Sequence, residues 1–265
     1  MSAQAPVLFS CKDLRVDVSG RTLVDALSFS VARGELLAIL GQNGSGKSLT
    51  MHTLAGLRTA AGGQVLLGEH DVATSNRQAL ARQLALLPQH VDDIFPATVL
   101  DTAMIGRHPH IGRFQWETTA DYEVGRAALA AVDLEQLARR DVLTLSGGER
   151  RRLAIAQVLT QQPDVYLLDE PTNHLDPQHQ LDALRLFRER ADNGATVIAS
   201  LHDVNLAVRY ADRCLLLYGD GRWDIGATND VLDEQRLTEL YGTTMESVAW
   251  RSTRLFVASG QTQST

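Results

Sequence analysis

The segment from Gly41 to Ser48 constrains the fold of this chain more than any other stretch of the sequence. It matches the pattern G-x-x-x-x-G-K-[ST], in which glycines, lacking a Cβ, let the backbone curl until successive N–H groups point at one anion. A buried strand, Glu35–Leu40, is predicted before this segment and a helix, Leu49–Leu57, after it. We therefore predict a phosphate-binding loop in an α/β fold, in which Lys47 supplies a mobile cation and the Ser48 hydroxyl can bind Mg²⁺.

Composition and charge narrow the class of protein. The chain has 265 residues, 44% of them hydrophobic, which is enough for one large α/β domain with an inserted subdomain. With a formal net charge of −7, we expect no nucleic-acid partner. No apolar run is long enough to cross a bilayer, and the first residues do not resemble a secretory signal. Cys11 and Cys214 are expected to be buried free thiols of a protein from a reducing compartment.

The residues before the phosphate-binding loop have the pattern of an antiparallel β-layer. Leu14–Val18 and Leu23–Val31 alternate apolar and polar residues, with a turn between them. After the loop, Gly62–Gly68 is predicted to be a short hairpin strand. A helix over Arg77–Arg82 and a buried strand over Leu84–Leu87 are predicted to follow.

Residues from about 91 to 160 are predicted to form an all-helical subdomain inserted into the α/β core. Helical periodicity is found in Val99–Met104, Thr119–Val132 and Leu134–Ala138. The segment Gly106–Gly112 is rich in turn-forming residues and is expected to be a loop. Its histidines, His108 and His110, have no carboxylate or cysteine beside them, so we expect exposed histidines rather than a metal pair.

A second candidate anion site begins at Ser146. Ser146, Gly147 and Gly148 would place a hydroxyl and two unobstructed N–H groups at the start of a basic helix, Arg150–Ala156. A simpler interpretation is an ordinary helix cap, in which Ser146 and Glu149 form a capping box. A cap alone does not account for the two glycines, so both interpretations stay open.

Two carboxylates lie at the end of a predicted core strand, Val165–Glu170. Because the carboxyl ends of parallel strands meet at one edge of a sheet, Asp169 is expected to bind Mg²⁺ beside the phosphate-binding loop. Glu170 would face the outermost phosphate as a general base or water-orienting group. His202 follows the predicted strand Thr196–Leu201 and could contact the same phosphate, although a lone histidine after a strand is usually structural.

Gln89 follows another predicted core strand and also has two interpretations. A glutamine in this position is normally an unremarkable solvent-facing residue. If its strand runs beside the phosphate-binding loop, the Gln89 amide could instead reach Mg²⁺ or the attacking water.

Together these motifs resemble those of the ATP-binding cassette (ABC) ATPases. The order and spacing of that family are matched by Gly41–Ser48, Gln89, Leu145–Glu149, Val165–Glu170, Asn173–Asp176 and His202. The resemblance covers Val7 to about Gly242, and its most specific part is Leu-Ser-Gly-Gly, the signature, which other phosphate-loop hydrolases lack. It implies a phosphate-loop NTPase core, an antiparallel β-layer and an inserted helical subdomain.

The resemblance implies ATP and Mg²⁺ as cofactors and assigns their contacts. Mg²⁺ would be held by Ser48, Gln89 and Asp169, and catalysis would involve Glu170, His202 and Gln89. The residues expected to contact ATP are Gly41, Gln42, Asn43, Gly44, Ser45, Gly46, Lys47, Ser48 and Leu49.

The resemblance also implies partners. Two cassettes would pair head to tail, so that the signature residues Ser146, Gly147, Gly148 and Glu149 contact ATP held by the partner. Asp176 would connect the two sites, and Gln89 and the helical insertion would face membrane-spanning permease subunits.

Three further segments resemble the ATPases of importers for iron–siderophores, haem and cobalamin. They are Gly106–His110, Leu201–Asp212 and Val231–Tyr241. This implies a peripheral ATPase at the cytoplasmic face of the inner membrane, with a periplasmic substrate-binding protein as an indirect partner. Two alternatives stay open, namely an exporter ATPase and a non-transport ABC ATPase acting on the ribosome or DNA.

Some positions depart from the family pattern. Val18 stands near the place of an aromatic residue that usually stacks on adenine, Leu49 replaces a usual threonine, and Glu149 replaces a usual glutamine. We expect one domain over residues 1–265. Its tail, from about 243 to 265, matches no family motif and suggests a terminal hairpin, followed by a frayed end at Gly260–Thr265.

Overall fold

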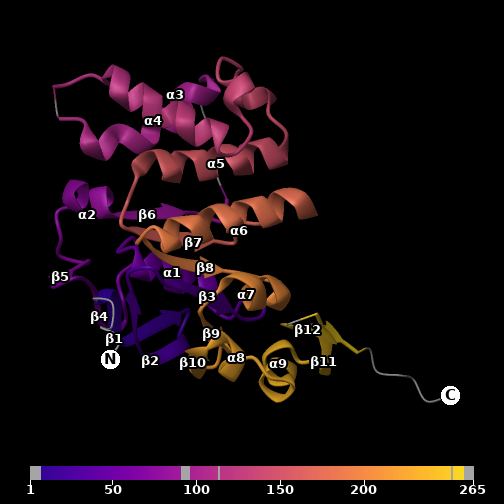
Figure 1. Ribbon diagram of the computed structural model, residues 1–265. Coiled ribbons are helices and arrows are strands. Elements are labelled where there is room, and N and C mark those ends of the chain that lie inside the picture. Colours follow the sequence, from indigo (N-terminus) through magenta and orange to yellow (C-terminus); the bar gives the residue numbers. More distant parts are fainter. Residues whose placement is uncertain (1–6, 91–95, 113, 252, 260–265) are drawn as a thin grey trace, which may run out of the picture.

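The computed structural model describes residues 7–90, 96–112, 114–251 and 253–259 (Figure 1). The strands are β1 (Val7–Val18), β2 (Arg21–Ala32), β3 (Leu36–Leu40), β4 (Gly62–Leu67), β5 (His70–Asp71), β6 (Leu84–Leu87), β7 (Val165–Asp169), β8 (Thr196–Ser200), β9 (Arg213–Leu217), β10 (Trp223–Ala227), β11 (Met245–Trp250) and β12 (Thr253–Ala258). The α-helices are α1 (Lys47–Leu54), α2 (Arg77–Gln83), α3 (Val99–Met104), α4 (Thr119–Ala130), α5 (Gly147–Gln161), α6 (Pro177–Asp192), α7 (Val204–Tyr210), α8 (Thr228–Val231) and α9 (Glu234–Tyr241). Short 3-10 helices are η1 (Ile105–His110), η2 (Glu135–Leu137) and η3 (Val142–Thr144).

The central sheet has the strand order β10-β9-β3-β8-β7-β6, and its neighbours pair in parallel except β10 with β9. Every residue of β3, β7 and β8 is buried. Successive side chains alternate between the faces, so Leu37 and Ile39 join the apolar cluster of the antiparallel layer, whereas Leu36, Ala38 and Leu40 join that of the helices. Because both faces are covered, these strands are mostly apolar, and polar residues occur only at their ends in β7 and β8.

A second sheet, with the order β2-β1-β4-β5, lies against one face of the central sheet (Figure 1). Met51 and Leu54 of α1 belong to the same apolar cluster as Phe9 and Leu14 of β1. The predicted antiparallel layer is therefore confirmed. The predicted strand at Gly62–Gly68 forms as β4, but it pairs mainly with β1 and makes only a two-residue ladder with β5.

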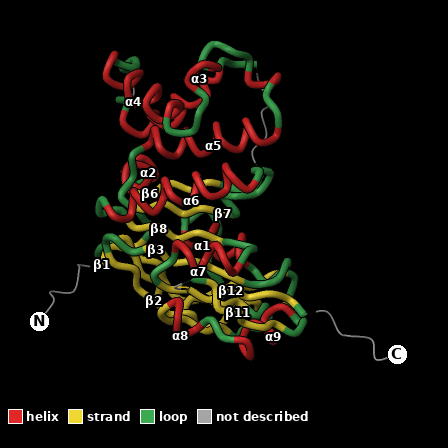
Figure 2. The backbone as a smooth tube through the Cα atoms, turned by 45° about the vertical axis from the view of Figure 1, so that its right-hand side comes forward, coloured by secondary structure: helices red, strands yellow, loops and turns green. Residues whose placement is uncertain are grey.

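Helices α3, α4 and α5 pack on one another at the end of the molecule far from the antiparallel sheet (Figures 1 and 2). Helix α5 also contacts β6, so it connects this helical unit to the central sheet. Two details of the helical prediction are wrong. The segment Gly106–Gly112 is mostly the 3-10 helix η1, and Leu134–Ala138 contains only the turn η2, because such short runs need no more than i→i+3 bonds. Residues 91–95 of the predicted insertion lie outside the described residues.

His108 and His110 lie in η1, and Cys11 and Cys214 lie in β1 and β9. His108 is exposed as expected, whereas His110 is half-buried with its Nε2 2.8 Å from the Gln161 carbonyl oxygen. Among the described residues, no group of three or more His, Cys, Asp or Glu could hold a metal ion. Cys11 and Cys214 are buried free thiols, as predicted, and burial raises their pKa to about 12 and about 11.

The C-terminal hairpin of β11 and β12 rests on α7 and α9. Asn205 of α7 fixes it, because its Nδ2 donates to the Phe256 carbonyl at 3.0 Å and its Oδ1 accepts from the Phe256 N–H at 2.8 Å. The segment Gly260–Thr265, expected to be frayed, lies outside the described residues. In the part of the chain that the structure describes, no helix has the length and apolar character needed to cross a membrane.

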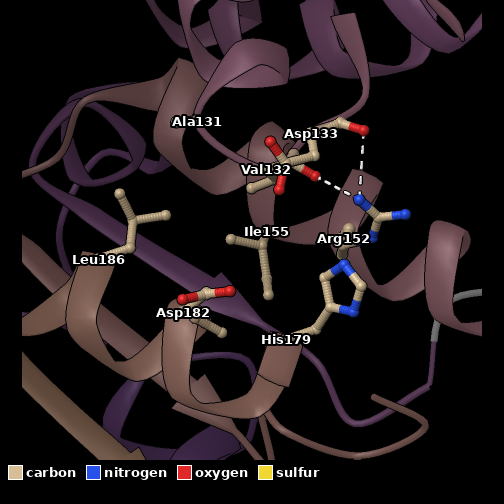
Figure 3. Close-up of a pocket in the computed structure, with 9 residues that line it drawn as sticks. Ala131, Val132, Asp133, Arg152, Ile155, His179, Asp182 and Leu186 are labelled. Atoms are coloured by element: carbon tan, nitrogen blue, oxygen red, sulfur yellow. Dashed lines mark hydrogen bonds between the residues drawn. The ribbon is translucent and has the colours of Figure 1, made fainter. Parts of the chain in front are cut away.

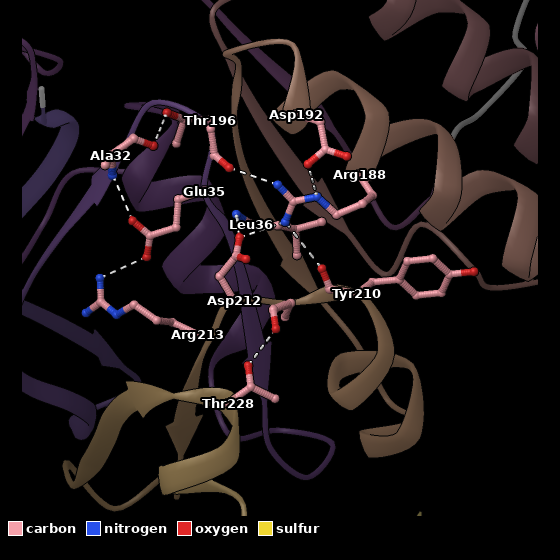
Figure 4. Close-up of polar contacts among 12 residues, drawn as sticks. Ala32, Glu35, Leu36, Arg188, Asp192, Thr196, Tyr210, Asp212, Arg213 and Thr228 are labelled. Carbon is pink, nitrogen blue, oxygen red and sulfur yellow. Dashed lines mark hydrogen bonds and ion pairs between the residues drawn. The ribbon is translucent and has the colours of Figure 1, made fainter. Parts of the chain in front are cut away.

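Arg188 of α6 joins three segments at the amino ends of β3 and β9 (Figure 4). Its guanidinium contacts Asp192 on its own helix at 2.9 Å, Asp212 at 2.6 Å and the Gly34 carbonyl oxygen at 2.8 Å. Asp212 also accepts the Leu36 N–H at 2.8 Å. This network fixes the edge of the sheet opposite to the phosphate-binding loop.

We expect Arg188→Met to lower the free energy of unfolding by about 2 kcal/mol, because it removes the charged donor shared by the Asp212 carboxylate and the Gly34 carbonyl oxygen. Arg185→Met on the same helix should cost less than about 1 kcal/mol, since Arg185 is largely exposed and, among the described residues, pairs only with Asp182. Urea titrations of both variants test this. Equal losses would mean that the Arg188 network contributes no more than an ordinary surface pair.

Candidate functional site

A cleft of about 520 Å³ lies at the carboxyl edge of the central sheet. Its lining residues are Val18, Leu23, Asn43, Gly44, Gly46, Lys47, Ser48, Leu49, Gln89, Glu170, Asn173 and His202. The structure therefore brings Gln89, Glu170 and His202 to the phosphate-binding loop. The size of the cleft suits a nucleotide.

The phosphate-binding loop is held in a wrapped conformation by its glycines. Gly46 caps α1 with a φ of 100°, in the left-handed region that favours glycine. Gly41, Gln42 and Ser45 do not line the cleft. Gly41 and Ser45 are buried, and a Cβ on Gly41 would lie 2.5 Å from the Leu217 carbonyl oxygen.

Lys47 is buried, and its Nζ donates to the carbonyl oxygens of Gly41 at 2.8 Å and Gln42 at 3.2 Å. Burial lowers its pKa, and the nearby carboxylates of Glu170 and Asp169 partly oppose that shift. A phosphate in the cleft could replace the two carbonyls as the partner of this amine. The loop thus keeps the Lys47 ammonium group next to the cleft.

Glu170 is the centre of the polar contacts in the cleft. It is 4% exposed, and its Oε1 lies 2.5 Å from His202 Nε2. Its Oε2 accepts from Gln89 Nε2 at 2.7 Å and from the Asn173 amide. The sequence pattern indicated Gln89 and His202 as neighbours of the reacting phosphate, but it did not indicate that both would hold the Glu170 carboxylate.

Asp169 and Ser200 lie opposite each other on β7 and β8. Ser200 Oγ donates to Asp169 Oδ1 at 2.7 Å and accepts the Glu170 N–H at 2.8 Å. Asp169 Oδ2 is buried and has no hydrogen-bond partner among the described residues. A buried carboxylate oxygen without a partner is costly unless a cation meets it, so the residues present fit a Mg²⁺ site. The sequence motifs did not indicate Ser200, because its only distinguishing feature in the sequence is that it ends an apolar strand.

Arg151 on α5 is a second residue that the sequence pattern did not indicate. It is buried, and its guanidinium donates to the backbone carbonyl oxygens of Gln89 and Glu170, among others. Burial lowers its pKa to about 10, so it remains charged at neutral pH.

Ser146 caps α5, and the predicted capping box with Glu149 is present. Ser146 Oγ accepts the Glu149 N–H at 3.3 Å, while Glu149 Oε2 accepts the Ser146 N–H at 2.7 Å. Hydrogen bonds from the backbone and the side chain of Ser146 lower the pKa of Glu149. A Cβ on Gly147 would meet nothing within 4 Å, so packing inside the chain does not require a glycine there. The cap and the anion site are therefore compatible interpretations.

The signature and Asp176 do not reach the cleft. None of Ser146, Gly147, Gly148 and Glu149 lines it, and Asp176 does not either. Asp176 caps α6, accepting the His179 N–H at 3.0 Å and lying 2.7 Å from His179 Nδ1, and these contacts lower its pKa. The chain thus carries two separate groups of predicted phosphate contacts.

Comparison with known proteins identifies relatives of this arrangement. The family model described as ABC transporter matches residues 24–173. The hemin import ATP-binding protein of Pseudomonas fluorescens is 40% identical over 236 residues, covering 87% of this chain and 91% of that protein. The cobalamin import ATP-binding protein of Halobacterium salinarum is 40% identical over 221 residues, covering 83% of this chain, which spans only 55% of that protein's length.

A solved structure also matches nearly the whole chain. It is that of a metal-chelate type ABC transporter in an inward-facing conformation, with a TM-score of 0.84 and 29% identity. The match covers 97% of this chain and 99% of the other.

We expect Asp169→Asn to weaken ATP binding by about tenfold or more in the presence of Mg²⁺ and to leave binding in EDTA unchanged. The amide oxygen can still accept from Ser200, but the uncharged side chain no longer binds a cation well. Titration with a fluorescent ATP analogue measures both affinities. Asp164→Asn is the control, because Asp164 lies just before β7 at its other end and pairs with Arg33 on the surface. Equal Mg²⁺ dependence in both variants would exclude Asp169 as a ligand.

Proposed function

Because this chain belongs to the ABC transporter family, we propose that it is the ATP-hydrolysing subunit of an importer for iron–siderophores, haem or cobalamin. The similar proteins named above import hemin and cobalamin, and the similar structure is of a metal-chelate type transporter. All three proposed cargoes are metal chelates. The observation that carries the ATPase proposal is the Glu170 carboxylate, buried at the end of the cleft between His202 and Gln89.

The cleft supplies the groups that hydrolysis requires. ATP lies with its phosphates on the loop, where Lys47 and the backbone N–H groups offset their negative charge. When bound, Mg²⁺ adds a further positive charge there, and Ser48, Asp169 and Gln89 would hold it. Glu170 accepts a proton from the attacking water, while His202 and Gln89 fix the direction of its carboxylate.

The active unit is a pair of chains. The signature of one copy contacts ATP bound by the other, which gives Ser146 and Gly147 a phosphate to bind and brings Asp176 to the interface. This proposal is supported by the separation of the signature from the cleft and by a glycine that packing does not require. ATP binding closes the pair, and hydrolysis releases it.

Glu170→Gln is expected to keep ATP binding and to lower kcat by about 100-fold or more, because the amide cannot accept the proton. The variant should then accumulate as an ATP-bound dimer. Steady-state hydrolysis and size-exclusion chromatography with MgATP measure the two effects. Turnover at the wild-type rate would rule out Glu170 as the base.

The helical unit offers a surface for the permease. Phe114 and Trp116 are 92% and 87% exposed, which is unusual for large aromatic side chains. They follow η1, which is bound to α2 because Gln78 and Arg82 donate to the Pro109 carbonyl oxygen at 3.2 and 2.7 Å. Helix α2 leads directly into β6 and Gln89. A permease seated on these aromatics would act on Gln89 through that path, with the chain at the cytoplasmic face of the membrane.

Trp116→Ser should reduce co-purification with a multi-spanning permease from gently solubilised membranes, because it removes an aromatic anchor. Trp250→Ser is the matched control, since Trp250 is 53% exposed on the C-terminal hairpin instead. Both variants should keep the wild-type thermal midpoint. Ribosomal or DNA-repair proteins in place of a permease would favour the non-transport alternative, and chelate uptake that persists without the chain would favour an exporter.

A further inference from the structure

Arg151 is buried on α5, and neither the sequence motifs nor the proposed reaction gives it a role. Only 4% of it is exposed. Its guanidinium donates to the backbone carbonyl oxygens of Pro88 (2.6 Å), Gln89 (3.4 Å), Asp169 (2.7 Å), Glu170 (2.7 Å) and Pro171 (3.3 Å). One side chain therefore binds the segment that carries Gln89 and the segment that carries both carboxylates.

The segment around Glu170 needs such support. Glu170 has a φ of 51°, a left-handed conformation that a non-glycine residue adopts only when its surroundings impose it. Its N–H is fixed by Ser200 Oγ and its carbonyl oxygen by Arg151 Nη2. Without Arg151, five backbone carbonyls would lose a charged donor, and the backbone could relax toward the extended region. That relaxation would turn the Glu170 side chain away from His202.

The next residue on the helix shows that this contact is specific to Arg151. Arg152 lies at a small pocket between α5, α6 and the turn after α4 (Figure 3). It donates to the carbonyl oxygens of Val132 at 2.8 Å and Asp133 at 3.2 Å, both in that turn. Arg152 thus fixes the helical unit, whereas Arg151 reaches the catalytic edge of the sheet.

We propose that Arg151 is a positioning residue that holds Glu170 and Gln89 in their working geometry and ties both to the helix that begins with the signature. The inference rests on the proposed roles of Glu170 and Gln89. Because α5 starts at Gly147 and Arg151 lies one turn further along, a displacement of the signature is carried directly to the backbone of the base. When the signature contacts the partner's ATP, the same movement then aligns Glu170 of its own chain.

The test compares kcat and KM for ATP in Arg151→Met, Arg151→Lys and a matched control. Arg107→Met is the control, because the Arg107 side chain is only 12% exposed and binds the other end of α5 through the Thr160 carbonyl oxygen at 3.3 Å. Arg151→Met should lower kcat by about 100-fold, the cost of a misplaced catalytic group, and leave KM unchanged. Arg151→Lys should fold and give an intermediate kcat, since an ammonium cannot span five carbonyls. Arg107→Met should keep kcat per folded molecule.

A double variant separates positioning from a general loss of structure. In the Glu170→Gln background, Arg151→Met should not lower the residual rate further, because the group that it positions is already inactive. The inference would be overturned if the losses of kcat in the two single variants multiplied in the double variant. It would also be overturned by a KM that rises as kcat falls, or by a wild-type kcat in Arg151→Lys. If Glu170→Gln itself keeps wild-type turnover, the proposed base is wrong. If the Arg151 variants keep the wild-type kcat and Glu170→Gln does not, the proposed base stands and only this inference is wrong.

Discussion

The parallel pairing of β7 with β8 is the constraint on which the site depends. It sets Asp169 opposite Ser200, and the serine hydroxyl then binds both the Asp169 carboxylate and the Glu170 N–H. The bond to Asp169 Oδ1 leaves Oδ2 without a partner among the described residues. The bond to the Glu170 N–H fixes the backbone where the Glu170 side chain enters the cleft. Since β3 runs parallel beside β8, Lys47 arrives at the same edge.

The cations of the site are bound by carbonyls rather than by carboxylates. Lys47 donates to two loop carbonyls and Arg151 to five backbone carbonyls, so neither forms a direct ion pair with Asp169 or Glu170. Asp169 and Glu170 are adjacent in the sequence and both are buried. Under the proposed function, the first binds a cation and the second a water molecule.

The parts of this site that sequence could predict are those that local rules determine. A loop that wraps a phosphate needs glycines and a lysine at fixed spacing, and buried strands need apolar runs, so Gly41–Ser48, Asp169 and His202 could be placed at one sheet edge. Ser200 and Arg151 could not, because their contacts join residues 31 and up to 63 positions apart and Arg151 bonds to main-chain carbonyls. Any residue type supplies such a carbonyl, so no pattern marks it. The 3-10 helix η1 was missed because its residues also suit an irregular loop.

Under the proposed pairing, each copy carries two half-sites, because the signature lies outside the cleft of its own chain. Under the proposed pairing, an isolated chain completes neither, and in dilute solution the encounter of two copies limits the rate. A permease that binds one copy at each of two positions would replace that encounter by a fixed high effective concentration. The permease would then raise the rate of ATP hydrolysis before any cargo arrives, because it holds two copies together.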